Sequence, residues 1–123
     1  MILKDTFYSI KSLEVIDNNL EANILIDPKH AIFDGHFPGN PVTPGVVQME
    51  IIKEILSVHF AKKAVLKTMG NCKFLAILNP NETPEVAVKL SITNQEDGSI
   101  KIAGQLATEK GACLKISAVY LLD

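Results

Sequence analysis

The sequence predicts an α+β fold in which an antiparallel sheet curls around a single helix. One convincing helical segment, residues 46–60, stands among segments in which apolar and polar residues alternate as they do in strands. Short turn signals separate several of the strand-like segments, which favours antiparallel pairing of neighbours. Because one helix cannot cover both faces of a sheet, the simplest arrangement wraps the sheet around it.

Two strands are predicted before the helix, at residues 7–17 and 20–27, on either side of a pair of asparagines. The second strand alternates apolar and polar positions, as a half-buried strand does. An irregular segment follows, in which three Gly and three Pro fall between Gly35 and Gly45. The helix begins just after this segment, where a proline suits the first turn because its missing N–H costs nothing there.

Four strands are predicted after the helix, joined by turns rich in Gly, Asn and Asp. They are residues 65–78 with a bulge at Gly70 and Asn71, residues 85–93, a strand around residues 100–106, and residues 112–122. The alternation is cleanest in the second of these, which predicts that Val86, Val88, Leu90 and Ile92 share one face.

Length and composition indicate a single domain over residues 1–123 with the balance of a soluble globular protein, since 47% of the residues are hydrophobic and 21% are charged. The net charge of −2 and the absence of Trp argue against nucleic-acid binding. No segment approaches the roughly 20 apolar residues of a membrane span, so a cytoplasmic location is expected. Cys72 and Cys113 are expected to be reduced thiols on strands. No metal or other cofactor is expected, because the spacing of cysteines and histidines does not match a zinc site.

The segment rich in Gly and Pro carries groups suited to acid–base chemistry. His36 stands in a loop that neighbouring prolines and glycines can hold rigid, as a general base requires. Gly45 opens the helix, where unpaired N–H groups suit a carbonyl oxygen that gains negative charge. Glu50, five residues into the helix, adds a second titratable group. Together these groups suit proton abstraction next to a carbonyl or protonation of a leaving group.

Each of these residues also has a purely structural interpretation. A lone histidine in a loop is usually a turn or surface residue. A polar stripe typical of a solvated helix face is formed by Glu50, Lys53, Glu54 and Ser57. Gln48 and His59 fall opposite this stripe, where they would be partly buried polar groups, and no role is assigned to them.

Residues 33–50 read FDGHFPGNPVTPGVVQME. A His-Phe-Pro-Gly loop, a Pro-Val-x-Pro-Gly sequence and an acidic residue 14 positions after the histidine resemble the β-hydroxyacyl-acyl-carrier-protein dehydratases of the FabA/FabZ type. Glu at the acidic position is similar to the branch that only dehydrates. The family's hotdog fold, an antiparallel sheet around one long helix, agrees with the predicted order of elements.

The resemblance implies removal of water from a (3R)-3-hydroxyacyl thioester on an acyl carrier protein, giving the trans-2-enoyl thioester. His36 would remove the C2 proton, and Glu50 would help the 3-hydroxyl leave as water. The Gly45 amide, with Val46 beside it, would bind the thioester oxygen. The Val42 carbonyl would accept a hydrogen bond from His36 and fix its tautomer.

The resemblance also implies an acyl tunnel and a second subunit. Phe33, Phe37 and Met49 are candidates for the tunnel, although core packing explains them about as well. In this family two subunits join edge to edge, and each site takes its histidine from one chain and its acid from the other. A homodimer is therefore expected, with a higher oligomer or a heterodimer as alternatives.

The sequence departs from the family pattern in two places. Lys53 and Glu54 stand where the family's helix is mostly apolar, which implies a wetter helix face, a different partner surface or a shorter tunnel. Residues 75–78 replace a basic run with Leu-Ala-Ile-Leu. These departures favour a branch that serves a secondary pathway, such as aryl-polyene synthesis. A hotdog acyl thioesterase, and a non-catalytic dehydratase-like subunit paired with an active partner, stay open as alternatives.

Overall fold

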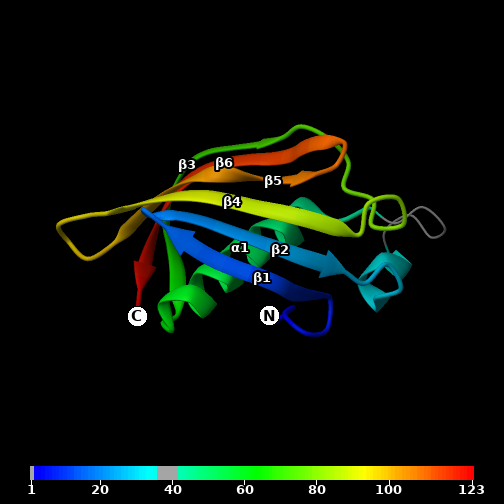
Figure 1. Cartoon of the computed structure of the whole chain (residues 1–123), viewed down its shortest axis with the longest axis horizontal. Helices are drawn as coiled ribbons and strands as arrows, with labels where there is room; N and C mark the ends of the chain where they lie inside the picture. Colours follow the sequence, from blue (N-terminus) through cyan, green and yellow to red (C-terminus); the bar gives the residue numbers. More distant parts are fainter. Residues whose placement is uncertain (1, 36–41) are drawn as a thin grey trace.

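The computed structural model describes residues 2–35 and 42–123 of the chain and shows one six-stranded sheet that arches over a helix (Figure 1). All strand pairs in the sheet are antiparallel. Along the sheet the order is β1 (Tyr8–Ile16), β2 (Asn19–Ile26), β4 (Glu85–Asn94), β5 (Ile100–Thr108), β6 (Gly111–Leu122) and β3 (Ala64–Phe74). The predicted α+β fold is confirmed, including two strands before the helix and four after it.

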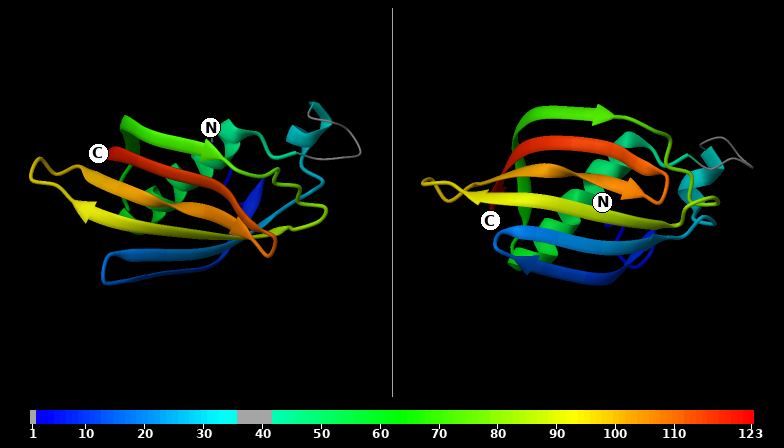
Figure 2. Two further views of the ribbon diagram at one scale, coloured as in Figure 1. Left: turned by 90° about the horizontal axis from the view of Figure 1, so that it is seen from above. Right: turned by 45° about the horizontal axis from the view of Figure 1, so that its top comes forward.

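Helix α1 (Gly45–Phe60) lies on the concave side of the sheet (Figure 2). Its buried face consists of Val47, Gln48, Ile51, Ile52, Ile55 and Leu56. Strand β4 buries the four aliphatic residues predicted to share a face. Within the described ranges, no helix combines the length and apolarity needed to cross a membrane.

Strand β3 is shorter than predicted. It ends at Phe74, so the prediction that it continues to residue 78 is wrong. The N–H of Leu75 still bonds to the Cys113 carbonyl at 2.8 Å, and the chain then leaves the sheet for a turn that begins near Asn79. The predicted bulge is confirmed, because the pairing with β6 shifts register between Met69 and Asn71.

The segment between β2 and α1 is more ordered at its start than predicted. A short 3-10 helix, η1 (Ala31–Gly35), follows β2 where an irregular loop was expected. The His30 side chain helps to begin it, since Nδ1 accepts a hydrogen bond from the Ile32 N–H at 3.0 Å. The ring of His30 also meets the edge of Phe7, with 5.3 Å between the ring centroids.

Candidate functional site

The amino end of α1 contains Gly45 and Val46, whose N–H groups were predicted to bind the substrate oxygen. Pro44 is the N-cap residue and offers no side-chain cap, and its carbonyl accepts the N–H groups of Val47 and Gln48, each at 3.1 Å. The N–H groups of Gly45 and Val46 have no acceptor among residues 2–35 and 42–123. As far as the described residues go, two donors at the positive end of a 16-residue helix are therefore unpaired, which suits an oxygen that gains negative charge.

Gly45 lies directly against the ring of Phe74 from the edge strand β3. A Cβ atom at position 45 would come within 2.6 Å of the Phe74 Cζ atom, which is too close for any real contact. The absence of a side chain therefore lets the β3 edge approach the start of the helix. Any larger residue at position 45 must displace the ring.

Glu50 lies one turn further along the helix and is the least constrained carboxylate of this region. Its side chain is 18% exposed, and its charged partner among the described residues is Lys53, whose Nζ lies 3.8 Å from Oε1. No donor among the described residues forms a hydrogen bond to it. Burial raises the pKa of Tyr120 to about 12, and the negative charge of Glu50 adds to that rise. Glu50 is thus a half-buried acid beside a protonated phenol, with its oxygens available for other partners.

Glu54 has a different environment, although it belongs to the same polar stripe. Its Oε2 accepts the N–H of Leu3 at 2.8 Å, and its Oε1 accepts the N–H of Lys4 and the hydroxyl of Tyr8, each at 2.9 Å. Leu3 and Tyr8 are both buried. The interpretation of the stripe as a solvated helix face is therefore wrong at Glu54, because the amino-terminal segment covers it.

The other predicted residues fall in different surroundings. His36 and Phe37 lie outside the described residues. Phe33 is buried in the core, with its ring centroid 5.4 Å from that of Phe7. Val46 points outward and is 68% exposed. Val42 and Met49 are half-buried.

The sequence pattern assigned no role to Gln48. In the structure it is a buried residue in the first turn of α1. Its side chain is 3% exposed, and Nε2 donates to the Thr43 carbonyl at 3.1 Å. Thr43 is likewise buried, and its N–H bonds to the Leu78 carbonyl at 2.9 Å. Its position in the sequence could have singled out Gln48, because it is a polar residue on the apolar side of the helix.

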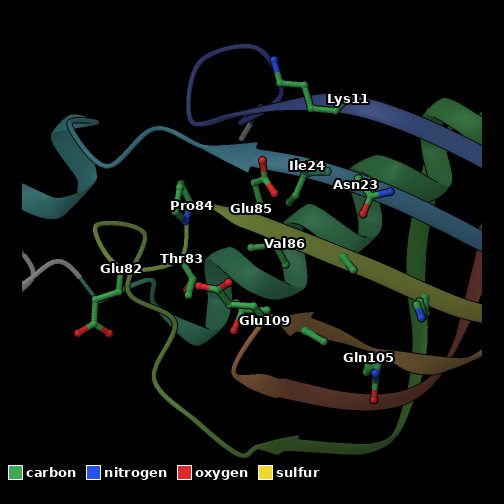
Figure 3. Close-up of a pocket in the computed structure, with 14 residues that line it drawn as sticks. Lys11, Asn23, Ile24, Glu82, Thr83, Pro84, Glu85, Val86, Gln105 and Glu109 are labelled. Carbon is green, nitrogen blue, oxygen red and sulfur yellow. The ribbon is translucent and has the colours of Figure 1, made fainter.

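Two open cavities lie away from these residues. One of about 550 Å³ opens on the sheet near the ends of β2, β4 and β5, where Thr83, Glu85 and Glu109 come together (Figure 3). Another, of about 610 Å³, lies beside the amino-terminal segment and includes Pro28 and Pro80. None of the described candidate residues lines either cavity.

Across the described part of the chain, no cluster of His, Cys, Asp and Glu could hold a metal ion. Cys72 on β3 and Cys113 on β6 are both free thiols, as predicted. Burial raises the pKa of each thiol, which keeps both in the protonated form.

Solved structures identify the class of fold. The ApeI:P dehydratase heterocomplex from Xenorhabdus doucetiae aligns with a TM-score of 0.65 and 19% identity, covering 91% of this chain and 96% of that chain. The (R)-hydratase of A. caviae involved in PHA biosynthesis gives 0.65 and 15%, covering 92% and 99%. A Haemophilus influenzae thioesterase gives 0.65 and 15%, covering 96% and 79%. These likenesses establish the hotdog fold that the resemblance implied.

Sequence comparison then identifies the family. The family model for ApeI-like proteins, described as ApeI dehydratase, matches residues 12–112, so the chain belongs to the ApeI-like dehydratase family. It is 31% identical to the 3-hydroxyacyl-[acyl-carrier-protein] dehydratase FabZ of Lactiplantibacillus plantarum over 90 residues, covering 68% of this chain and 60% of that protein. The FabZ of Rickettsia conorii is 28% identical over 89 residues, covering 63% and 61%. The aligned part spans about 60% of the length of these curated relatives.

Proposed function

We propose that this chain dehydrates a (3R)-3-hydroxyacyl thioester carried on an acyl carrier protein. His36 removes a proton from C2, and the electrons form the C2–C3 double bond as the C3–O bond breaks. Glu50 delivers a proton to the departing hydroxyl, which leaves as water. The products are the trans-2-enoyl thioester and water. His36 has gained the C2 proton and Glu50 has lost one to the hydroxyl, so the total number of protons on the two side chains is unchanged.

The carboxyl group of Glu50, which in its protonated form can supply the proton for the leaving hydroxyl, carries this proposal. It is half-buried, it receives no hydrogen bond from a described residue, and it stands one helical turn from the unpaired N–H groups of Gly45 and Val46. An acid that exchanges protons with a substrate needs such freedom, whereas the thioester oxygen needs the fixed donors. Membership of the ApeI-like family and similarity to FabZ proteins support the same reaction.

We also propose that the working unit contains two chains. Strand β3 is an edge of the sheet, and the outer edge of an edge strand offers unpaired backbone groups to another chain. The end of this strand and the start of α1 expose several large apolar side chains, namely Val46, Phe74, Leu75 and Ile77. A second copy that joins along β3 would cover this surface and would bring its own helix start near Glu50.

One assay separates the reaction from the thioesterase alternative. A 3-hydroxyacyl or enoyl thioester on a carrier protein is supplied, and enoyl absorbance and free thiol are followed together. Reversible change in absorbance without thiol release supports the dehydratase, whereas thiol release indicates a thioesterase. The substitutions His36→Ala and Glu50→Gln should each lower turnover by at least ~100-fold.

Mixing the two inactive variants tests whether the site is shared between chains. If each site takes His36 from one chain and Glu50 from the other, one site of each mixed dimer keeps both groups. Random re-pairing should then restore about a quarter of wild-type activity. No restoration would show that both groups come from one chain.

The structural relative from Xenorhabdus doucetiae is a heterocomplex, which supports a second possibility for assembly. Under this alternative the chain pairs with a different dehydratase-like subunit, and one set of site residues is idle. Absence of turnover by the purified chain over several acyl lengths, with activity after addition of a second such subunit, would establish it.

A further inference from the structure

Two buried polar atoms lack hydrogen-bond partners, and both lie where the chain enters α1. Among the described residues, these are the Thr43 hydroxyl oxygen and the side-chain oxygen of Gln48. The two side chains are 2% and 3% exposed. Buried polar groups in native structures nearly always have partners, and a group without one is destabilising. Stability alone therefore does not explain why this apolar part of the helix carries a glutamine.

The carboxamide of Gln48 does make one bond, and that bond acts on the backbone. Its Nε2 donates to the Thr43 carbonyl at 3.1 Å. The N–H of Thr43 is held as well, by the Leu78 carbonyl at 2.9 Å. Thr43 is thus fixed on both sides, once by the loop after β3 and once by a side chain of the helix.

Because peptide groups are planar, these hydrogen bonds also orient two groups of the proposed site, the Val42 carbonyl and the Gly45 N–H. The carbonyl and N–H of one trans peptide point in opposite directions. The bond from Thr43 N–H to Leu78 therefore aims the Val42 carbonyl away from Leu78. In the same way, the Pro44 carbonyl accepts two helix N–H groups, which aims the Gly45 N–H out of the helix.

The peptide between Thr43 and Pro44 joins these two fixed planes, and Gln48 holds it. Pro44 has no N–H, so the Thr43 carbonyl is the group through which this middle plane can be held by hydrogen bonding. We infer that Gln48 is a positioning residue of the proposed active site, because its Nε2 sets the angle between the Val42 carbonyl and the Gly45 N–H. A carboxamide that brings its Nε2 donor to the Thr43 carbonyl also buries its oxygen, and this is why the oxygen of Gln48 is left without a partner.

The inference rests on the proposed function, and Gln48→Met tests it. Methionine keeps the length and burial of the side chain but cannot donate to Thr43. The free energy lost with the hydrogen bond to Thr43 is offset by the free energy gained when the unpaired oxygen is removed. The melting temperature should therefore stay close to that of the wild type. The kcat should fall by about 10- to 100-fold with little change in KM, because a misplaced oxyanion donor acts on the transition state.

Gln105→Met is the matched control. Gln105 lies on β5, opposite Lys89 and Lys115 of the neighbouring strands, and it belongs to no proposed part of the site. The same chemical change there should leave kcat and KM within about twofold of the wild type. Gln48→Leu provides a second apolar variant should the methionine fail to pack.

Amide hydrogen exchange gives a readout that does not depend on turnover. In Gln48→Met, protection of the Thr43 N–H should fall at least ~10-fold while amides in β4 and β5 keep their protection. Unchanged protection at Thr43, or a kcat within twofold of the wild type, would overturn the inference. Absence of activity in the wild type would instead contradict the proposed function, and the exchange measurement would still test the role of Gln48 in holding Thr43.

Discussion

Two glutamates on successive turns of α1 face the same side of the molecule and have opposite environments. Glu54 receives three hydrogen bonds from the amino-terminal segment, all between 2.8 and 2.9 Å. Glu50 receives none from a described residue and has only a lysine at 3.8 Å. The difference shows that residue type and spacing do not decide how firmly a carboxylate is held. The partners that the fold brings to each carboxylate decide it, and they leave Glu50 the better candidate for chemistry.

The bonds of Glu54 assign it a structural role. Its two oxygens tie residues 3, 4 and 8 to the helix, and they satisfy two backbone donors that would otherwise be unpaired beside a buried leucine. A carboxylate held in this way cannot turn toward a substrate without releasing the segment. Glu50 can turn, since its side chain breaks no hydrogen bond to a described residue when it moves.

The largest expected effect is on turnover, in Glu50→Gln. Loss of the acid should lower kcat by at least ~100-fold, the scale of general acid–base catalysis. Stability in urea should stay within about 0.5 kcal/mol of the wild type, because the loose contact with Lys53 contributes little. Wild-type turnover in this variant would remove Glu50 from the mechanism.

The next effect is on stability, in Glu54→Ala. Removing an acceptor of three charge-assisted hydrogen bonds should lower the free energy of unfolding by about 2 to 3 kcal/mol. Tyr8→Phe removes only one of these bonds and should cost about 1 kcal/mol. Urea titration measures both. An Ala variant as stable as the wild type would show that the amino-terminal segment is not held by Glu54.

The stability of the fold in alkaline solution should depend on the tyrosine beside each carboxylate, which is Tyr8 for Glu54 and Tyr120 for Glu50. Burial raises the pKa of Tyr120 to about 12, and burial and the bond to Glu54 hold that of Tyr8 far above its ordinary value of 10.0. The unfolded chain ionises both from about pH 10, whereas the folded chain keeps its protons. Their contribution to stability is therefore complete below pH 10 and is lost as the pH rises toward 12 and beyond.

Urea midpoints measured from pH 9 to 12 check this dependence. Tyr8→Phe and Tyr120→Phe should each show a shallower decline than the wild type across that window. Parallel curves for all three proteins would mean that neither phenol is perturbed in the folded state.

The smallest expected effect is that of Lys53→Met. The Lys53 side chain is 35% exposed and its Nζ lies 3.8 Å from Glu50 Oε1, so the pair is a loose contact that solvent reaches. The free energy of unfolding should change by no more than ~0.5 kcal/mol. A larger loss, measured in the same urea titrations, would mean that Glu50 is held more firmly than its contacts indicate.

Much of the fold could be predicted from local pattern. Alternation located the strands, Pro44 marked the helix start, and Gly70 marked the bulge. The early end of β3 was missed because Leu75 and Ile77 are apolar yet exposed, which periodicity cannot reveal. Apolar exposure of this kind depends on what the tertiary structure leaves uncovered.

The site was predictable only in part. The motif made Gly45 and Glu50 candidates, and their roles stay predictions. The partners of Glu54 lie 46 to 51 residues away in the sequence, where spacing carries no information. Gln48 was visible as a polar residue on the apolar side of the helix. Its bond to Thr43 depends on how the chain enters the helix, and that path became apparent only in three dimensions.

The most direct test of this account measures turnover and stability together in Glu50→Gln and Glu54→Ala. The account predicts that Glu50→Gln is as stable as the wild type and loses at least ~100-fold in kcat. It predicts that Glu54→Ala is less stable and keeps its turnover per folded molecule. The reverse pattern, with activity lost at Glu54 and retained at Glu50, would contradict the account.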